Sequence, residues 1–407
     1  MRRGRRAGRV RIALAASPLP GLRASAVCHV AREAWQSERP RDSLRCRPAS
    51  DGVASAYSES GVYELLGLDE LVERGGPLRR FAGVSQRKIA LDWIESLPGP
   101  FCGDSTALGE DIAWALGRGV DEIVVALGVP GGIGDLGVGM IGAIAQARRG
   151  AGPESRSRKA DGSRQADGFP GLAKTAERPG VVAAADVADL AGLVADARAA
   201  LGTVCLSVVV GGRQRLMGMS GLARAWMREG LDGRRAQEAE RSIGEAADRL
   251  VRAANATPGK DLAGRRLSAR GPHSGAGGGL ALGLEALGGR IVPVGDLVHS
   301  SLEGWAEGAD LCVYVCGQVG EELPGGAAGA IRRAQEAGLP VVLVYDCGSL
   351  RRGELAGLGL NGAYEMRPER SFLDEPETPE SAAAVRDRLG DAIRAVAGTW
   401  GWRRPMD

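Results

Sequence analysis

Short runs of consecutive apolar residues alternate along the chain with longer segments that carry apolar residues at helical spacing. The runs, which are typical of strands buried on both faces of a sheet, lie at Val10–Ala16, Ser43–Arg47, Arg87–Ile94, Ile123–Leu127, Val204–Val210, Arg290–Val294, Leu311–Val315 and Leu339–Tyr345. The helical pattern predicts helices at Arg23–Gln36, Ser55–Leu71, Gly109–Leu116, Met140–Ala147, Arg234–Ala253, Leu280–Leu287, Val298–Ala306, Ala327–Ala337 and Ala382–Ala397. Because strands and helices alternate, the predicted fold class is α/β, and the β-α-β opening indicates a parallel sheet.

The glycine-rich segment after the strand at Ile123–Leu127 is the first candidate for a binding loop. Its glycines surround one acid, Asp135, and a predicted helix follows. A strand, a glycine loop and a helix together point backbone N–H groups at an anion, but the same glycines also allow a helix to pack closely on a strand. Gly132, Gly134 and Gly137 satisfy G-x-G-x-x-G. An NAD site is disfavoured, because no acid ends a second strand about 20 residues later.

A second glycine run and an isolated acid are further candidates. Gly275, Gly277, Gly278 and Gly279 directly precede a predicted helix, which is the arrangement of a loop that cradles phosphate oxygens. Asp51 follows a predicted strand, and the carboxyl ends of strands are where open α/β sheets bind ligands. An acid at this place can hold Mg²⁺ or a substrate hydroxyl, or it can simply cap a turn.

Length, charge and cysteine content restrict the function classes. A chain of 407 residues is too long for one ordinary core, so two domains are expected. A net charge of +2 argues against a dedicated nucleic-acid binder, although residues 1–9 form a basic tail. No apolar stretch is long enough to span a membrane, and no cysteine and histidine spacing completes a zinc set. We therefore expect reduced thiols, a cytoplasmic location, and no nucleic-acid or membrane partner.

The polar stretch at residues 148–180 differs from the rest of the chain. It is rich in Arg, Ser, Gly and Asp and poor in apolar residues. Such a composition does not bury enough surface to offset the entropy of an ordered chain. We therefore predict a solvated or disordered loop.

Six short motifs occur in a recognisable order from Val10 to Val344. They are VRIALAASPLPGLRASAV at the start, Ser50-Asp51-Gly52, Thr106–Ile112, Pro130–Met140, Gly275–Leu284, and Ala309-Asp310-Leu311 with Gly317. In this order they resemble the motifs of bacterial glycerate kinases of the two-domain, non-P-loop type.

The resemblance implies two α/β domains, one inserted in the other, with a cleft between them. The implied boundaries are 10–68 with 286–407 for the first domain and 69–285 for the inserted one. The implied reaction is ATP- and Mg²⁺-dependent phosphorylation of glycerate or a related small hydroxy acid. Asp51 and Asp135 would be catalytic, Asp135 would also hold the metal, and Ser17 and Arg23 would contact the substrate. The two glycine loops, with Gly132, Gly134 and Gly137 in one and Gly275, Gly277, Gly278 and Gly279 in the other, would bind the nucleotide.

Several charged positions of those kinases are replaced here. The acid and the lysine of their D-S-F-K-G turn are Ser17 and Pro20, and a glutamate of their T-G-E-G motif is Cys316. Proline has no donor with which to contact a phosphate or carboxylate. The sequence therefore leaves a second hypothesis open, namely a catalytically inactive relative that acts as a binding or regulatory module.

Overall fold

The computed structural model describes the chain in eleven segments. These are residues 9–53, 59–68, 70–74, 80–93, 105–128, 134–150, 187–228, 230–258, 266–320, 322–367 and 381–400. The chain divides into two compact units, which we call the terminal unit (Met1–Leu68 with Pro293–Asp407) and the central unit (Asp69–Val292). Each contains one sheet and several helices, so the predicted α/β class is confirmed.

The terminal unit is built on a five-stranded parallel sheet in the order β11-β10-β9-β1-β2. Its strands are β1 (Arg11–Ala16), β2 (Ser43–Pro48), β9 (Leu311–Val319), β10 (Val341–Gly348) and β11 (Gly362–Glu365). Its helices are α1 (Ala24–Glu38), α2 (Val62–Leu65), α10 (Val294–Ser301), α11 (Gly325–Glu336) and α12 (Ala382–Trp400), with a short 3₁₀ turn, η3 (Arg352–Glu354).

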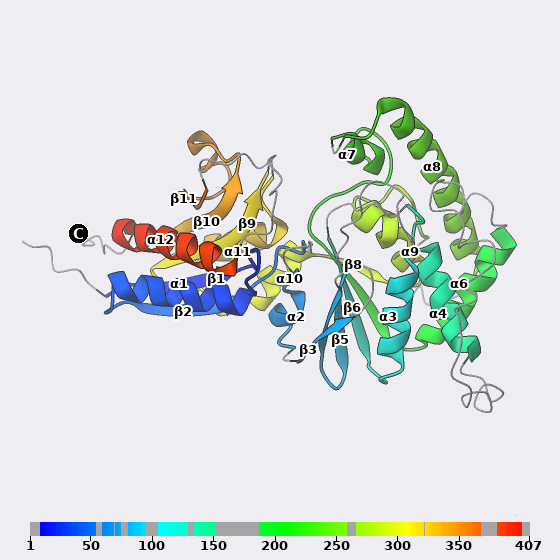
Figure 1. Ribbon diagram of the computed structural model, residues 1–407, viewed down its shortest axis with the longest axis horizontal. Helices are drawn as coiled ribbons and strands as arrows, with labels where there is room; N and C mark the ends of the chain where they lie inside the picture. Colours follow the sequence, from blue (N-terminus) through cyan, green and yellow to red (C-terminus); the bar gives the residue numbers. More distant parts are fainter. Residues whose placement is uncertain are drawn as a thin grey trace, which may run out of the picture. The chain divides into compact units, whose positions relative to one another are not determined.

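The connections of this sheet diverge from β1 and β9. The chain moves from β1 to β2 in one direction and from β9 through β10 to β11 in the other. Because crossovers between parallel strands are right-handed, α1 and α11 are expected on opposite faces of the sheet. Figure 1 shows α12 beside α1, and residues of both helices share one core with β1, β9 and β10. The boundary between β1 and β9 is the place where such sheets bind ligands.

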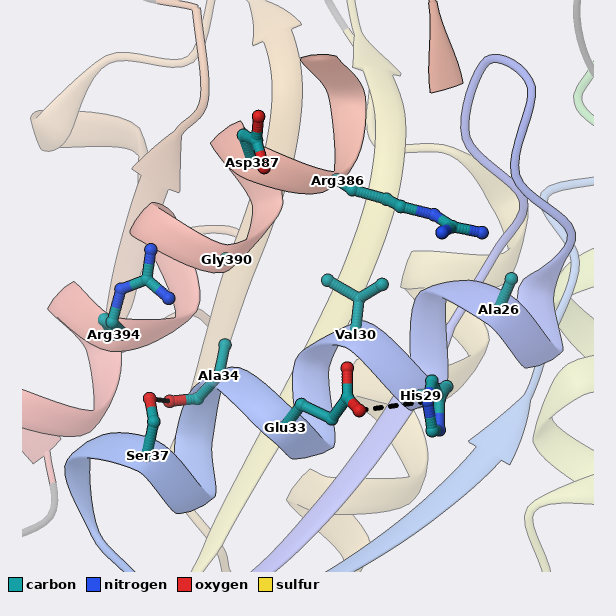
Figure 2. A pocket seen from close by; sticks show the side chains of 10 residues that line it. All are labelled: Ala26, His29, Val30, Glu33, Ala34, Ser37, Arg386, Asp387, Gly390 and Arg394. Carbon is teal, nitrogen blue, oxygen red and sulfur yellow. Dashed lines mark hydrogen bonds and ion pairs between the residues drawn. The ribbon is translucent and has the colours of Figure 1, made fainter. Parts of the chain in front are cut away.

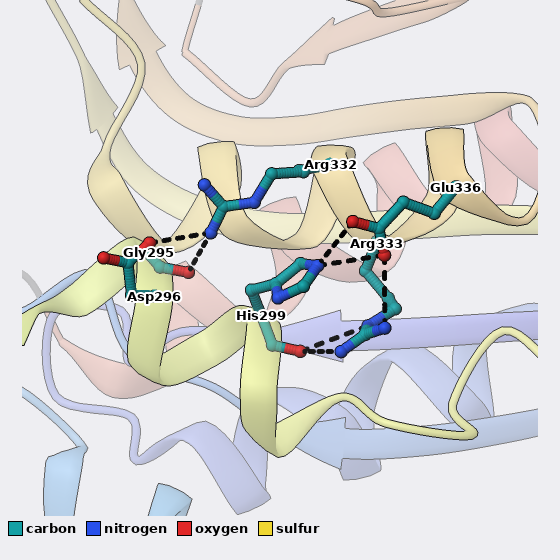
Figure 3. A network of polar contacts seen from close by, with 6 residues as sticks. All are labelled: Gly295, Asp296, His299, Arg332, Arg333 and Glu336. Carbon is teal, nitrogen blue, oxygen red and sulfur yellow. Dashed lines mark hydrogen bonds and ion pairs between the residues drawn. The ribbon is translucent and has the colours of Figure 1, made fainter.

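Helices α10 and α11 approach each other closely at two glycines. A Cβ on Gly295 would lie 2.7 Å from the carbonyl oxygen of Gly325, so a larger residue does not fit there. Polar contacts secure this approach (Figure 3): Arg332 Nη2 lies 2.8 Å from Asp296 Oδ1, and His299 Nε2 lies 2.9 Å from Glu336 Oε1.

The central unit is built on a six-stranded sheet in the order β3-β4-β5-β6-β7-β8. Its strands are β3 (Glu70–Arg74), β4 (Arg80–Val84), β5 (Lys88–Trp93), β6 (Glu122–Leu127), β7 (Cys205–Val210) and β8 (Arg290–Pro293). Its helices are α3 (Thr106–Leu116), α4 (Val138–Gly150), α6 (Val187–Leu201), α7 (Leu222–Arg228), α8 (Gly233–Ala256) and α9 (Leu280–Ala286), with a 3₁₀ turn, η2 (Ala276–Gly279). Strands β5, β6 and β7 are parallel, whereas β3 and β4 pair antiparallel.

The long helix α8 illustrates how a capping residue and an apolar stripe in the sequence define a helix and its buried face. Asp232 accepts a hydrogen bond from the backbone N–H of Arg234 over 2.7 Å and so caps the first turn. The apolar stripe of the helix, which includes Ile243 and Leu250, is buried in the core of the central unit. None of the helices in the described part of the chain is long and apolar enough to cross a membrane.

The structure corrects three details of the sequence prediction. The helix predicted at Ser55–Leu71 is limited to α2 among the described residues, because Gly61 and Gly67 adopt positive φ angles of 72° and 68°. The division between the units falls at Pro293 rather than at residue 286, because β8 belongs to the sheet of the central unit. Arg148 and Arg149 form the last turn of α4, where both pair with Asp196 of α6.

Two predicted segments lie largely outside the described residues. They are residues 151–180 of the predicted polar loop and residues 1–8 of the predicted basic tail.

Candidate active site

Three side chains meet where the connections of the terminal sheet diverge. Ser17 directly follows β1, Asp51 follows β2, and Tyr314 belongs to β9. The Tyr314 hydroxyl donates to Asp51 Oδ1 over 3.0 Å and lies 2.7 Å from Ser17 Oγ. Ser17 and Tyr314 are buried, whereas Asp51 remains partly exposed. The structure therefore brings the predicted residues Ser17 and Asp51 together at the expected edge of the sheet, joined by Tyr314.

The surroundings of the Asp51 carboxyl group shift its pKa upwards. Burial raises its pKa from the ordinary value of 3.8 to about 6, and hydrogen bonds from Tyr314, Ser17 and the Ala327 backbone lower it in part. The N-terminus of α11 approaches so closely that a Cβ on Gly326 would lie 2.7 Å from Asp51 Oδ1. A carboxylate with such a pKa is suited to accept a proton from a substrate hydroxyl.

The neighbours of Asp51 are held neutral. Cys316 is buried, and desolvation together with the Asp51 charge raises the pKa of its thiol. The same two causes raise the pKa of the Tyr314 hydroxyl well above its ordinary value. Asp51 therefore supplies the negative charge of this cluster at neutral pH, while Ser17, Tyr314 and Cys316 surround it with uncharged groups.

The predicted substrate contact Arg23 lies just before the first turn of α1. Its side chain is 52% exposed, and its Nε lies 3.8 Å from Glu59 Oε1. The first turn of α1 already receives a carboxylate from within the unit, because the backbone N–H of Ser25 donates to Glu64 Oε1 over 3.3 Å. The guanidinium group is half-exposed and lies farther from its carboxylate, at 3.8 Å, so it is the part more available to an acidic substrate.

In the central unit, Asp135 is held by four hydrogen bonds. Its Oδ2 accepts from the backbone N–H of Ser105 (3.0 Å), from Ser105 Oγ (2.8 Å) and from the backbone N–H of Gly139 (3.0 Å). Its Oδ1 accepts from the backbone N–H of Gly137 over 2.9 Å. The Ser105 hydroxyl in turn accepts from the N–H of Met140 over 2.8 Å.

These bonds give Asp135 a structural role. The carboxylate joins the residue before α3 to the first turn of α4, and it lies at the positive end of the α4 dipole. Burial raises the pKa of Asp135, and the hydrogen bonds oppose that rise. Three of the four donors to this carboxylate are backbone N–H groups, so neighbouring glycines can hold it although they have no side chains. Its metal-binding role stays a prediction, and the described residues contain no group of three or more metal-ligating side chains.

The two glycine loops lie side by side at the carboxyl end of β6. A Cβ on Gly137 would lie 3.1 Å from the Cα of Gly283, and one on Gly279 would lie 2.5 Å from Leu136 Cδ2. Gly277 packs against the Leu127 side chain in the same way. Gly275, Gly277, Gly278 and Gly279 are buried, whereas Gly134 and Asp135 are partly exposed. Gly132 lies outside the described residues.

Replacing Gly279 with Ala should destabilise the central unit by more than backbone strain alone. Gly279 has a φ of 97° and no room for a Cβ, whereas Gly230 has a φ of 102° and nothing within 4 Å. Both Gly→Ala changes incur the strain of a positive φ, but only Gly279→Ala also overpacks the core. We expect Gly279→Ala to lower the free energy of unfolding by about 1–3 kcal/mol more than Gly230→Ala in urea titrations. Equal losses would show that the two loops do not pack as described.

A pocket of about 450 Å³ lies elsewhere on the terminal unit, between α1 and α12 (Figure 2). Its polar lining includes His29, Glu33, Arg386 and Arg394, and His29 Nε2 lies 3.2 Å from Glu33 Oε1. The residues that line it include none of the predicted site residues. The pocket is therefore distinct from the cluster around Asp51.

Comparison with known proteins identifies the family. The model of the glycerate kinase family matches residues 95–397. The fold is similar to the crystal structure of a putative glycerate kinase 2 from Salmonella typhimurium LT2, with a TM-score of 0.60 and 17% identity. That match covers 97% of this chain and 98% of the other. No curated protein sequence matches the chain significantly. The family match spans well over half of the chain and agrees with the resemblance of the motifs, so this protein belongs to the glycerate kinase family.

Proposed function

We propose that this protein is a kinase that uses Mg·ATP to phosphorylate glycerate or a related small hydroxy acid. Membership of the glycerate kinase family supports a phosphotransferase with an alcohol group as acceptor. The observation that carries the proposal is Asp51, a partly exposed carboxyl group with a pKa of about 6 at the edge of the sheet where ligands are expected.

In this proposal the terminal unit binds and activates the acceptor. Asp51 is mainly ionised at neutral pH and accepts the proton of the substrate hydroxyl, while Tyr314 and Ser17 fix the orientation of the carboxylate. The exposed guanidinium group of Arg23 pairs with the carboxylate of the hydroxy acid. Phosphoryl transfer depends more on such positioning and charge neutralisation than on covalent chemistry, so a single base is sufficient on the acceptor side.

In this proposal the central unit binds the nucleotide at the partly exposed end of its first glycine loop. Gly134 and Asp135 are partly exposed, and Asp135 Oδ1 accepts one hydrogen bond where Oδ2 accepts three. We propose that this oxygen contacts Mg²⁺, which commonly binds one or two carboxylates together with water and phosphate oxygens. The loop at Gly134–Gly137 would contact the phosphates, and the buried run at Gly275–Gly279 would support it from behind. When bound, Mg·ATP supplies the phosphoryl group.

Ligand-induced thermal shifts test this proposal. A ligand at about 100 times its Kd adds roughly 2.7 kcal/mol to the stability of the folded state, which raises Tm measurably. We expect separate shifts with Mg·ATP and with glycerate, and Arg23→Ala should remove the glycerate shift while preserving the shift with Mg·ATP. The absence of both shifts in the parent protein would contradict the proposal.

Tyr314→Phe should move the pH dependence of turnover. The Tyr314 hydroxyl stabilises the ionised form of Asp51, so its removal raises the pKa of that carboxyl. The acidic limb of the kcat/KM profile, expected near pH 6 in the parent, should therefore shift to higher pH. The control is Tyr364→Phe, because the Tyr364 hydroxyl accepts from Trp400 Nε1 and belongs to β11. An unchanged pH profile of kcat/KM in Tyr314→Phe would show that Asp51 is not the base.

The alternative function is that of a catalytically inactive homologue that acts as a binding or regulatory module. The neutral Ser17 and Cys316, at positions where the kinases it resembles carry acids, are the observation in its favour. It predicts thermal shifts with the same ligands and no turnover.

A further inference from the structure

Two cysteines of the terminal unit form a contact that the proposed reaction does not use. Cys28 belongs to α1 and Cys46 to the neighbouring strand β2. The Cys46 thiol donates to the carbonyl oxygen of Cys28 over 3.6 Å, so the Cys46 sulfur lies against the residue that carries the second thiol. Cys28 is 6% exposed, whereas Cys46 is only partly buried. Both carry free thiols.

A pocket with mainly basic charged side chains lies beside the contact between Cys28 and Cys46. This pocket, of about 440 Å³, lies at β2, the edge strand of the sheet, and Cys46 lines it. Its charged lining is Arg11, Arg32, Arg45 and Glu307, which leaves an excess of positive charge. Arg32 lies one turn beyond Cys28 on α1 and lines the same pocket as Cys46. A small polar oxidant can therefore reach Cys46 next to a cation that stabilises a thiolate.

The surroundings shift the pKa values of the two thiols in opposite directions. The hydrogen bond from Cys28 lowers the pKa of Cys46, burial opposes this effect, and Arg32 lowers the pKa further. The same hydrogen bond and burial raise the pKa of Cys28. Cys46 is the more exposed thiol, it lines the pocket and it has the lower pKa, so it is the nucleophile of the pair, and Cys28 is the protonated neighbour that its sulfur contacts.

We propose that Cys46 is a peroxide-reactive site and that Cys28 resolves it into a disulfide. The Cys46 thiolate attacks one oxygen of hydrogen peroxide, the O–O bond breaks, and the leaving hydroxide takes a proton to become water. The Cys28 sulfur then attacks the Cys46 sulfenic acid. The S–O bond breaks, the Cys28 proton leaves with the hydroxide as a second water, and an S–S bond remains. Two thiols are oxidised and one peroxide is reduced to two waters.

Exposure of the full-length reduced protein to one equivalent of hydrogen peroxide tests the site. After alkylation of the remaining thiols, peptide mapping should find a Cys28–Cys46 disulfide. Cys205, which is exposed and separate from this pocket, is the internal control and should remain alkylated. Oxidation of Cys205 in preference to Cys46, or the absence of the Cys28–Cys46 disulfide, would overturn the proposal.

Two variants separate the roles of the thiols. In Cys28→Ser the reaction should stop at the sulfenic acid of Cys46, which dimedone traps. In Cys46→Ser the thiol of Cys28 should stay reduced. Circular dichroism confirms that each variant is folded before treatment. Dimedone labelling of Cys28 in Cys46→Ser would assign the primary reaction to the wrong cysteine, and the parent protein tests the disulfide independently of both variants.

Discussion

Replacing Asp51 with Asn should lower the rate of phosphoryl transfer by a factor of about 10² or more and should at the same time stabilise the protein. Activity falls because the amide does not accept the substrate proton. Stability rises because the parent holds a charge in a largely desolvated position: the pKa of Asp51 is raised to about 6, so ionisation above that pH destabilises the folded state. At pH 8 the gain is at most about 3 kcal/mol.

The pH dependence of unfolding gives the sign of this effect. The folded state binds the Asp51 proton more tightly than the unfolded state, in which the pKa is near 3.8. The stabilisation by the protonated form is therefore complete below that value and is lost as the pH rises to about 6. Urea titrations from pH 4 to pH 7 should show this loss in the parent relative to Asp51→Asn. An Asn variant that is less stable than the parent at pH 8 would contradict the described burial.

The same substitution at Asp135 should have the opposite effect on stability. Asn has one acceptor oxygen, and its amide would face either Gly137 N–H or the donors of Ser105 and Gly139. A lost hydrogen bond and an unsatisfied N–H should together outweigh the relief of the burial that raises the pKa of Asp135, and should lower the free energy of unfolding by about 1–3 kcal/mol.

Urea titrations at pH 8 compare Asp135→Asn with Asp248→Asn. Asp248 is 76% exposed and pairs with Arg252 on the same helix, so its replacement should change stability little. An Asp135→Asn variant as stable as the parent would mean that the carboxylate does not join α3 to α4. Loss of activity in that stable variant would then assign Asp135 to the reaction alone.

The strands that are buried on both faces were predictable from the sequence. β1, β6, β7, β9 and β10 all appear as continuous apolar runs. The antiparallel strands at Glu70–Arg74 and Arg80–Val84 were missed, since charged residues leave only two apolar residues in the first and the second is short and contains a glycine. The helix at Val187–Leu201 was missed because alanines surround its apolar positions and weaken the periodicity.

The candidate site was predictable only in part. Asp51 and Ser17 follow strands, so the rule for parallel sheets brings them to one edge. Tyr314 resembles an ordinary core residue within an apolar strand, and only the register of β9 against β1 places its hydroxyl beside Asp51. Ser105 precedes a helix, which is a capping signal, but its bond to Asp135 joins residues 30 positions apart.

The measurement that tests the central claim most directly is ADP formation by the purified protein with Mg·ATP, in the presence and absence of glycerate. The account predicts glycerate-dependent ADP formation, with one phosphorylated hydroxy acid produced for each ADP, and loss of both products in Asp51→Asn. A folded parent protein that binds both ligands but forms no ADP with glycerate or related small hydroxy acids would contradict the proposed activity and favour a binding or regulatory role.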